Sequence, residues 1–298
     1  MKFSLAIIKF EDWKRFQSKP ATVMGFACEL RAFCLFLRDP EVESITAVMV
    51  LEYLEALLGL GWKHNTVAHK CNYLRGFFRF LRMQGIAVLD ENLIPKPKHQ
   101  FKLPRVATTE ECEKLAAAIS RASTAYALRA RALFGLLWDT GARVGEIVSL
   151  NVEDLDLERM RAVVRTEKSR TSHPYREIFW TPQTNDNLQR WLEKRQRLPV
   201  AADHRDALFT NIAGANAHER LTSGSVAQML RALCVKAGIG YLNAHSFRHH
   251  LGHEIINQGG SASDVMNILG HSNLSATAIY TMMTDRELEA RYRAINGF

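Results

Sequence analysis

The segment from His245 to Tyr280 contains side chains that can attack a phosphate ester. His245 and Arg248 form a His-x-x-Arg pair, Gly270 and His271 follow a leucine, and Tyr280 stands nine positions after His271. Because residues three apart share a helix face, His245 and Arg248 can reach one phosphate together. An arginine binds two phosphate oxygens and stays charged, while a tyrosine hydroxyl forms a phosphotyrosine ester that keeps the energy of the bond for a later joining step. The pattern therefore predicts attack on a phosphodiester without a metal.

An earlier segment supplies a second arginine. Thr140, Gly141, Arg143 and Glu146 form the pattern Thr-Gly-x-Arg-x-x-Glu. Followed in order by a lysine, His-x-x-Arg, Gly-His and Tyr, this pattern resembles the tyrosine recombinase (phage-integrase-like) family. The resemblance is strong over the range Thr108–Tyr280 and looser in the N-terminal third.

The resemblance implies a role for each of these side chains. Tyr280 would attack the scissile phosphate and form a 3′-phosphotyrosyl link. Arg143 and Arg248 would neutralise the non-bridging oxygens, where a second negative charge develops in the transition state. His245 and His271 would add hydrogen-bond donors or proton transfer. The family needs no metal, nucleotide or other cofactor, so we expect none here.

The family also places a lysine in a β-hairpin, where it protonates the departing 5′-hydroxyl. The corresponding residue is Lys168, in the polar loop Thr166–Pro174. The glycines that usually flank this lysine are missing, which leaves the conformation of the loop open and allows Arg170 to share the role. Glu146, three positions after Arg143, is expected to orient the site rather than to react.

These residues require a scaffold, and the hydrophobic pattern after residue 107 predicts one that is mainly helical. Thr108-Thr-Glu-Glu111 has the form of a capping box that opens a helix. Two short strands, Arg161–Arg165 and Tyr175–Trp180, flank the lysine loop. Other helices are expected up to Ser120, at Tyr126–Trp138, Gln183–Gln196 and Ser223–Ala237, and in a tail that opens at Thr284. The predicted fold class is mainly α (α+β), with a small β-hairpin or sheet in the catalytic domain.

The first third of the chain is also predicted to be helical. Apolar side chains recur at helical spacing in Ala21–Arg38, Ser44–Gly59 and Asn65–Met83. This layout resembles the small helical core-binding (SAM-like) domain of the family. The third helix carries Lys70, Arg75 and Arg79, which either contact DNA or solvate an exposed helix face.

A basic segment joins the two parts. Ile94–Arg105 contains three prolines together with Lys96, Lys98 and Lys102, so an extended, cationic linker is expected. Such a linker gains affinity for DNA through counterion release, or it merely solvates a domain boundary. We therefore predict a helical DNA-binding domain at residues 1–93, a linker at 94–106, and a catalytic domain with a C-terminal tail helix at 107–298.

Composition limits the class of protein. The net charge of +8 over 298 residues favours a polyanionic partner, most plausibly nucleic acid. The five cysteines contain no C-x-x-C pair, which indicates buried free thiols rather than disulfides or a zinc knuckle. A short apolar patch near the N-terminus is interrupted by Lys9 and followed by Glu11 and Asp12, so it predicts neither a signal peptide nor a membrane span. We expect a cytoplasmic protein without a membrane partner.

Other functions compete for the same residues. His245, His249 and His253 recur every four residues and precede Glu254, which allows a zinc site and a metal-dependent phosphodiesterase. Against this alternative, no His-Glu-x-x-His motif occurs, and Arg248 would place a positive charge beside the metal. A type IB-like topoisomerase uses similar residues. A catalytically inactive DNA-binding protein would need the cations but not the tyrosine, so the intact set favours a recombinase.

The resemblance also implies partners. Double-stranded DNA target sites are expected, with a homotetramer assembled on two duplexes and the C-terminal tail docked on a neighbouring subunit. Integration or transposition of a mobile element is the favoured role, because the lysine loop departs from the Xer pattern. Xer-type resolution of chromosome or plasmid dimers is the alternative.

Overall fold

The computed structural model describes residues 1–98, 100, 105–166, 175–270, 292–293 and 297. The chain divides into two compact units, Met1–Lys102 and Leu103–Phe298, and each has its own hydrophobic core. The division falls within the segment expected to be a linker. The fold class is mainly α with a small antiparallel sheet, as the sequence predicts.

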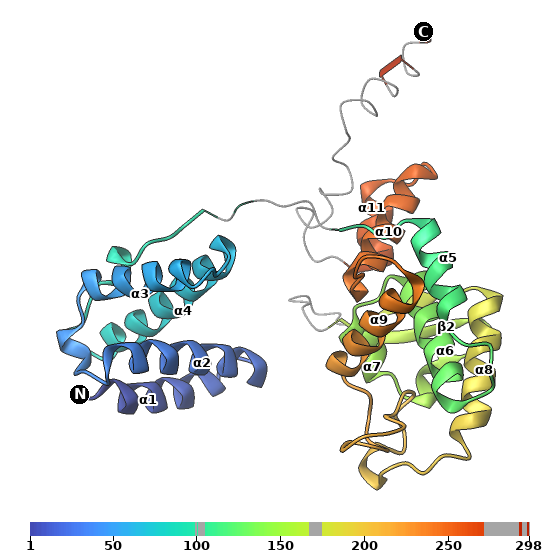
Figure 1. Ribbon diagram of the computed structural model, residues 1–298, viewed down its shortest axis with the longest axis horizontal. Helices are drawn as coiled ribbons and strands as arrows, with labels where there is room; N and C mark the ends of the chain where they lie inside the picture. The colour runs from blue at the N-terminus through green and yellow to red at the C-terminus, as the bar shows by residue number, and fades with distance from the viewer. Residues whose placement is uncertain (99, 101–104, 167–174, 271–291, 294–296, 298) are drawn as a thin grey trace. The chain divides into compact units, whose positions relative to one another are not determined.

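The first unit is a helical bundle (Figure 1). Its elements are α1 (Phe3–Arg15), α2 (Pro20–Leu37), η1 (Val42–Ser44), α3 (Ala47–Gly59), α4 (His64–Met83) and η2 (Glu91–Leu93), where η denotes a 3-10 turn. Local chemistry sets the helix ends. Pro20 opens α2, because its fixed φ suits the first helical turn. Arg38 ends that helix in the left-handed conformation, with φ of 62°. The hydroxyl of Thr46 caps α3 by accepting from the amide of Met49.

Helix α1 is one of the elements that the sequence analysis does not predict. Phe3, Ile7 and Phe10 lie on one face and are at most 2% exposed. The ring of Phe3 lies 5.6 Å from that of Phe33 and 4.9 Å from that of Phe77, measured between centroids. Packing against distant aromatic residues therefore stabilises a helix too short to be stable on its own.

Helix α2 has the length and apolar composition of a membrane-spanning helix, and no other helix in the described part of the chain does. It buries Leu30 and Phe33 completely in the bundle. A core helix passes the same test of length and composition, so this feature is weak evidence for a membrane span.

The second unit carries the predicted catalytic residues. Its elements are α5 (Thr109–Ala118), α6 (Ala125–Thr140), α7 (Val144–Ser149), η3 (Val152–Asp154), β1 (Leu155–Asp156), β2 (Arg161–Arg165), β3 (Tyr175–Phe179), α8 (Pro182–Arg195), η4 (Ala202–His204), α9 (Ser223–Ala237), α10 (Ala244–Asn257) and α11 (Ala262–Leu269). The predicted capping box forms at the start of α5, between Thr108 and Glu111. All five cysteines are free thiols, and all except Cys28 are buried.

Helix α6 is the centre of the second unit (Figure 1). It is apolar on most sides and packs against α5, α8 and α10. A Cβ at Gly135 would stand 2.4 Å from the hydroxyl oxygen of Thr184, so the glycine permits the close approach of α8. The three strands form one antiparallel sheet in the order β1-β2-β3. In its register Val164 of β2 faces Arg176 of β3.

Candidate catalytic site

The turn between α6 and α7 positions Arg143. Thr140 ends α6, and its hydroxyl donates to the carbonyl oxygen of Leu136 at 2.6 Å and accepts from the amide of Ala142 at 3.0 Å. Gly141 then adopts a left-handed conformation with φ of 55°. A Cβ at Gly141 would lie 2.8 Å from a methyl group of Leu269, so the position requires glycine for both conformation and space. The Thr-Gly-x-Arg pattern is therefore a tight turn that places Arg143 at the start of α7.

The carboxylate of Glu146 joins two arginines. Glu146 is fully buried, and its Oε1 accepts from Nη1 of Arg143 at 2.9 Å. Its Oε2 accepts from the backbone amide of Arg143 at 2.9 Å and from Nη2 of Arg176 at 2.8 Å. Burial raises the pKa of the Glu146 carboxyl, but Arg176 and then Arg143 outweigh burial and hold that pKa below its usual value. We call these three residues the arginine–glutamate cluster.

Arg176 is a member of this cluster that the sequence analysis missed. Its side chain is 9% exposed on β3, on the same strand face as the buried Ile178. Its Nη1 also donates to the carbonyl oxygen of Ile268 at 2.9 Å. The sequence did contain a signal for it. Arg176 stands two positions before the apolar Ile178 in a predicted strand, which places a charged side chain on the inward face of that strand.

Arg248 lies on α10 and is 3% exposed. Its Nη1 donates to the carbonyl oxygen of Gly141 at 2.9 Å, and its Nη2 donates to that of Leu269. Arg248 therefore fastens α10 both to the turn that carries Arg143 and to the end of α11. His245, one helical turn earlier, is exposed. The structure thus brings Arg143, Glu146 and Arg248 to one place, the turn at Gly141.

Of the remaining histidines of α10, His250 is buried, and His249 and His253 are partly buried. His250 is 7% exposed, and its ring lies edge-on to that of Trp138, with centroids 6.4 Å apart. Burial, followed by the nearby His245, His253 and Arg248, lowers the pKa of His249 to about 4. His249 is therefore neutral at pH 7. Among the residues that the structure describes, no three His, Cys, Asp or Glu side chains are grouped so that they could hold a metal ion.

Several predicted residues lie outside the described part of the chain. They are Lys168 and Arg170 of the polar loop, His271, the predicted nucleophile Tyr280, residues 284–291, 294–296 and 298 of the predicted tail, and Lys102 of the linker. The described chain reaches the borders of these segments. β2 ends at Arg165, β3 begins at Tyr175, and α11 is followed by Gly270.

The cations predicted to bind DNA in the first unit differ in their surroundings. The ammonium group of Lys70 pairs with the buried carboxylate of Glu29, which also accepts from the hydroxyl of Tyr53 at 2.9 Å. Arg75 donates to the carbonyl oxygen of Ile94 at 2.7 Å. Lys70 therefore serves the interior of the bundle.

The other predicted DNA contacts are at the surface. Arg79 pairs with Glu91 at 3.2 Å, but its side chain is 61% exposed. Lys96 and Lys98 are exposed as well. These three residues retain the accessibility that a phosphate contact requires.

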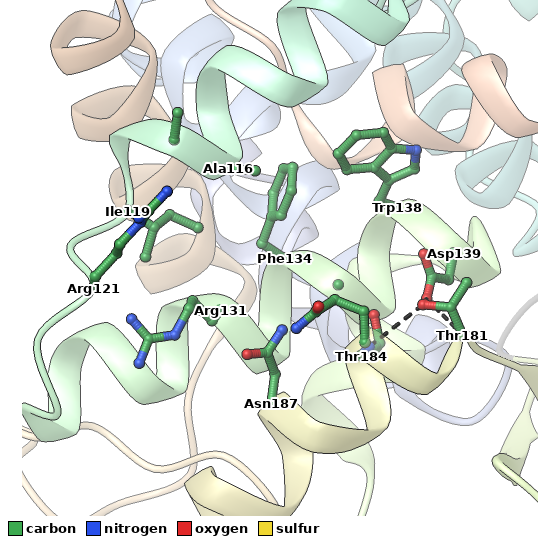
Figure 2. A pocket seen from close by; sticks show the side chains of 13 residues that line it. Ala116, Ile119, Arg121, Arg131, Phe134, Trp138, Asp139, Thr181, Thr184 and Asn187 are labelled. Carbon is green, nitrogen blue, oxygen red and sulfur yellow. Dashed lines mark hydrogen bonds between the residues drawn. The ribbon is translucent and has the colours of Figure 1, made fainter.

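A cavity of about 570 Å³ opens between α5, α6 and α8 (Figure 2). Trp138 and Asp139 line one side, and Arg131 lies on the other. Asp139 holds Thr181, the N-cap residue of α8, by accepting from its amide and its hydroxyl, each at 2.8 Å. Among the described residues, none of the predicted catalytic side chains lines this cavity. The candidate site is therefore elsewhere, at the Gly141 turn.

Comparison with known families covers both units. Residues 105–287 match the phage integrase family, and residues 14–85 match its N-terminal SAM-like domain. The tyrosine recombinase XerC of Roseiflexus castenholzii is 30% identical over 87% of this chain and 82% of its own length. The tyrosine recombinase XerC of Listeria monocytogenes is 28% identical over 91% of this chain and 90% of its own.

Solved structures share the fold. The Tn1549 transposon integrase, in complex with transposon right end DNA, has a TM-score of 0.74 at 19% identity and covers 99% of this chain and 100% of its own. The XerH site-specific recombinase, bound to palindromic difH substrate, has a TM-score of 0.72 at 24% identity and covers 92% of this chain and 79% of its own. With a family match over more than half its length, and a relative at 30% identity, the chain belongs to the phage integrase family of tyrosine recombinases, which are site-specific DNA recombinases.

Proposed function

We propose that this protein cuts and rejoins duplex DNA through a 3′-phosphotyrosyl intermediate on Tyr280. The observation that carries the proposal is the convergence of Arg143 and Arg248 on the turn at Gly141. Two fixed guanidinium groups neutralise the charge that develops on a five-coordinate phosphorus. Glu146 is the carboxylate that keeps Arg143 in place.

The remaining roles follow from the family resemblance. Tyr280 attacks phosphorus, and the bond to the 5′-oxygen breaks. Lys168 supplies the proton that this leaving oxygen takes up. His245 and His271 contribute hydrogen bonds or proton transfer at the phosphate. The reverse reaction, with a 5′-hydroxyl of another strand as nucleophile, rejoins the DNA and releases Tyr280.

The partner in this proposal is double-stranded DNA. The net charge of +8 and the exposed Lys96, Lys98 and Arg79 support it. The fold is also shared with recombinases that were solved on DNA. Recombination joins two duplexes, so we expect a homotetramer on DNA, with the C-terminal tail linking neighbours. The protein would act where the DNA is, in the cytoplasm.

For the biological role we propose integration or transposition of a mobile element. The loop around Lys168 lacks the flanking glycines usual in the family and departs from the Xer pattern, and the Tn1549 transposon integrase shares the fold over nearly the whole chain. The second candidate is Xer-type resolution of chromosome or plasmid dimers, which is favoured by 30% identity to a protein named XerC.

Covalent trapping tests the chemistry. The protein is incubated in EDTA with a pool of nicked duplexes whose sequence around the nick is randomised, and adducts that survive denaturation are isolated and sequenced. We expect an adduct on Tyr280, mapped by peptide mass, that is absent from Tyr280→Phe. An adduct on another residue such as Tyr292, or cleavage that stops on chelation, contradicts the proposal. The sequences recovered also distinguish the two roles, because element ends and chromosomal dimer-resolution sites differ.

A further inference from the structure

Arg176 occupies an unusual position for a charged residue. It stands on the buried face of the sheet opposite Val164, and its side chain is 9% exposed. Burial lowers the pKa of Arg176. The neighbouring Glu146 raises that pKa, but by less than burial lowers it. Its Nε–H finds no hydrogen-bond acceptor within the described part of the chain. Burying such a group is costly, and apolar replacements of buried ion pairs are often as stable. Stability alone is therefore a poor reason for this arginine.

The charges of the arginine–glutamate cluster give a better reason. Glu146 and Arg143 alone would form a neutral pair, and the carboxylate would cancel much of the attraction of Arg143 for a phosphate. The guanidinium of Arg176, 2.8 Å from the same carboxylate, brings the cluster to a net charge of +1. Because the site is partly buried, this difference acts more strongly than it would in water.

The contacts of Arg176 also join separate segments of the chain. Through β3 it belongs to the hairpin whose loop carries Lys168. Through Nη2 it reaches Glu146, and through Nη1 it reaches the carbonyl oxygen of Ile268, three residues before His271. The side chain also lies directly over Gly270, where a Cβ would stand 2.5 Å from Cδ and 2.7 Å from Nε of Arg176. The glycine of the Leu-Gly-His motif thus makes room for this arginine.

We propose that Arg176 is a positioning residue for DNA cleavage, which sets Arg143 through Glu146 and fixes the chain that leads into His271. The inference rests on the proposed function, because it assumes that Arg143 and His271 act on the phosphate. Arg176 itself need not touch the DNA.

The test separates binding from cleavage. Adduct formation is measured in a single turnover on a nicked duplex recovered from the trapping experiment, for Arg176→Met and Arg176→Lys. Non-covalent affinity is measured in the Tyr280→Phe background, where no cleavage occurs. We expect Arg176→Met to form the adduct about 10- to 100-fold more slowly, because small displacements of catalytic groups have effects of this size. Affinity for DNA should change less than about threefold.

Two further variants make the result specific. Arg176→Lys should restore part of the rate, since one ammonium group can serve Glu146 or Ile268 but lacks the planar fork that reaches both. Glu146→Gln combined with Arg176→Met should be no slower than the slower single variant, because a neutral amide at residue 146 no longer needs the second cation. If the rate reduction of the double variant equals the product of the two single reductions, Arg176 and Glu146 act independently, which would contradict the proposal that Arg176 acts through Glu146.

Arg161→Met is the matched control. Arg161 lies in the same sheet and pairs with two carboxylates, Asp156 at 3.2 Å and Glu177 at 2.6 Å, but contacts no member of the cluster in the described structure. It should cleave at the wild-type rate. A rate for Arg176→Met within twofold of wild type, or a loss that merely follows loss of folded protein, overturns the inference. If the wild-type protein forms no adduct on Tyr280, the proposed function fails first and the inference fails with it.

Discussion

Arg176 and Arg248 donate to the carbonyl oxygens of two consecutive residues, Ile268 and Leu269. These carbonyls belong to the last turn of α11, where backbone acceptors lack partners within the helix and the helix dipole is negative. One arginine comes from a strand and the other from α10, so the end of α11 is held from two directions. His271 follows two residues after Leu269.

The packing of Arg176 against the end of α11 predicts that alanine substitutions at two helix-ending glycines differ in their cost to stability. Gly238 and Gly270 both end a helix with φ of 67°, but a Cβ at Gly238 meets nothing within 4 Å. Gly238→Ala should cost about 1 kcal/mol of unfolding free energy, from backbone strain. Gly270→Ala should cost about 1–3 kcal/mol more, because its methyl group collides with Arg176. Urea unfolding of both variants checks this, and equal losses would contradict the packing described here.

The Glu146 carboxylate predicts a dependence of stability on pH. Its pKa is lower in the folded protein than its usual value of 4.5. A depressed carboxyl pKa stabilises the folded state above the unfolded pKa, and this contribution is lost as the pH falls through the folded pKa. Glu146→Gln should therefore be less stable than wild type by about 3 kcal/mol at pH 7, because it leaves buried guanidinium groups without a counter-charge. The gap should narrow below pH 4.5. Urea unfolding of wild type and Glu146→Gln at pH 7 and below pH 4.5 tests the prediction. An equal difference in unfolding free energy at the two pH values would refute it.

His249 predicts a loss of stability in the same direction, as the pH falls, but in a different pH window. Its folded pKa of about 4 lies below the usual 6.5, so the unfolded chain binds the proton more readily between these values. Wild type should lose stability relative to His249→Gln as the pH falls from 6.5 towards 4, with no change above pH 7. Titration of the imidazole by NMR gives the pKa directly. A midpoint near 6.5 would show that His249 is not shielded from solvent.

In the first unit, we expect substitution of the buried-paired Lys70 to affect stability, and substitution of the exposed Lys96 or Lys98 to affect DNA binding. Lys70→Met leaves the buried Glu29 carboxylate without its ion-pair partner and should destabilise the bundle by about 3 kcal/mol. Lys96→Met and Lys98→Met should leave stability unchanged, and each should reduce the slope of log affinity against log salt by about 1. Salt-dependent binding and thermal unfolding of the same variants separate the two effects. An unchanged slope for both linker variants would remove the linker from the DNA interface.

Much of the fold was predictable because its signals are local. The helices at α2, α4 and α9 follow from apolar spacing, and β2 agrees residue for residue with the predicted strand Arg161–Arg165. Helix α1 escaped prediction because its stability depends on distant aromatic residues. The same reason explains Lys70, which the sequence places on a cationic helix surface but which pairs with Glu29 of α2.

The site shows the same limit. The Thr-Gly-x-Arg and His-x-x-Arg patterns identify Arg143 and Arg248 because each motif is short. Arg176 belongs to no such motif. Its surroundings depend on the register of β2 and β3 and on its hydrogen bonds to Glu146 and Ile268, which are distant in sequence. Contacts between residues so far apart in sequence are set by tertiary packing alone.

The double anchoring of α11 has a consequence for protein engineering. In a chimera that exchanges the C-terminal segment of this protein for that of another recombinase, a junction after Gly270 keeps both carbonyl anchors and the glycine beneath Arg176. A junction placed before Ile268 imports a helix end that has not been matched to Arg176 and Arg248. Exchange of the C-terminal segment should therefore succeed at the first junction and fail at the second.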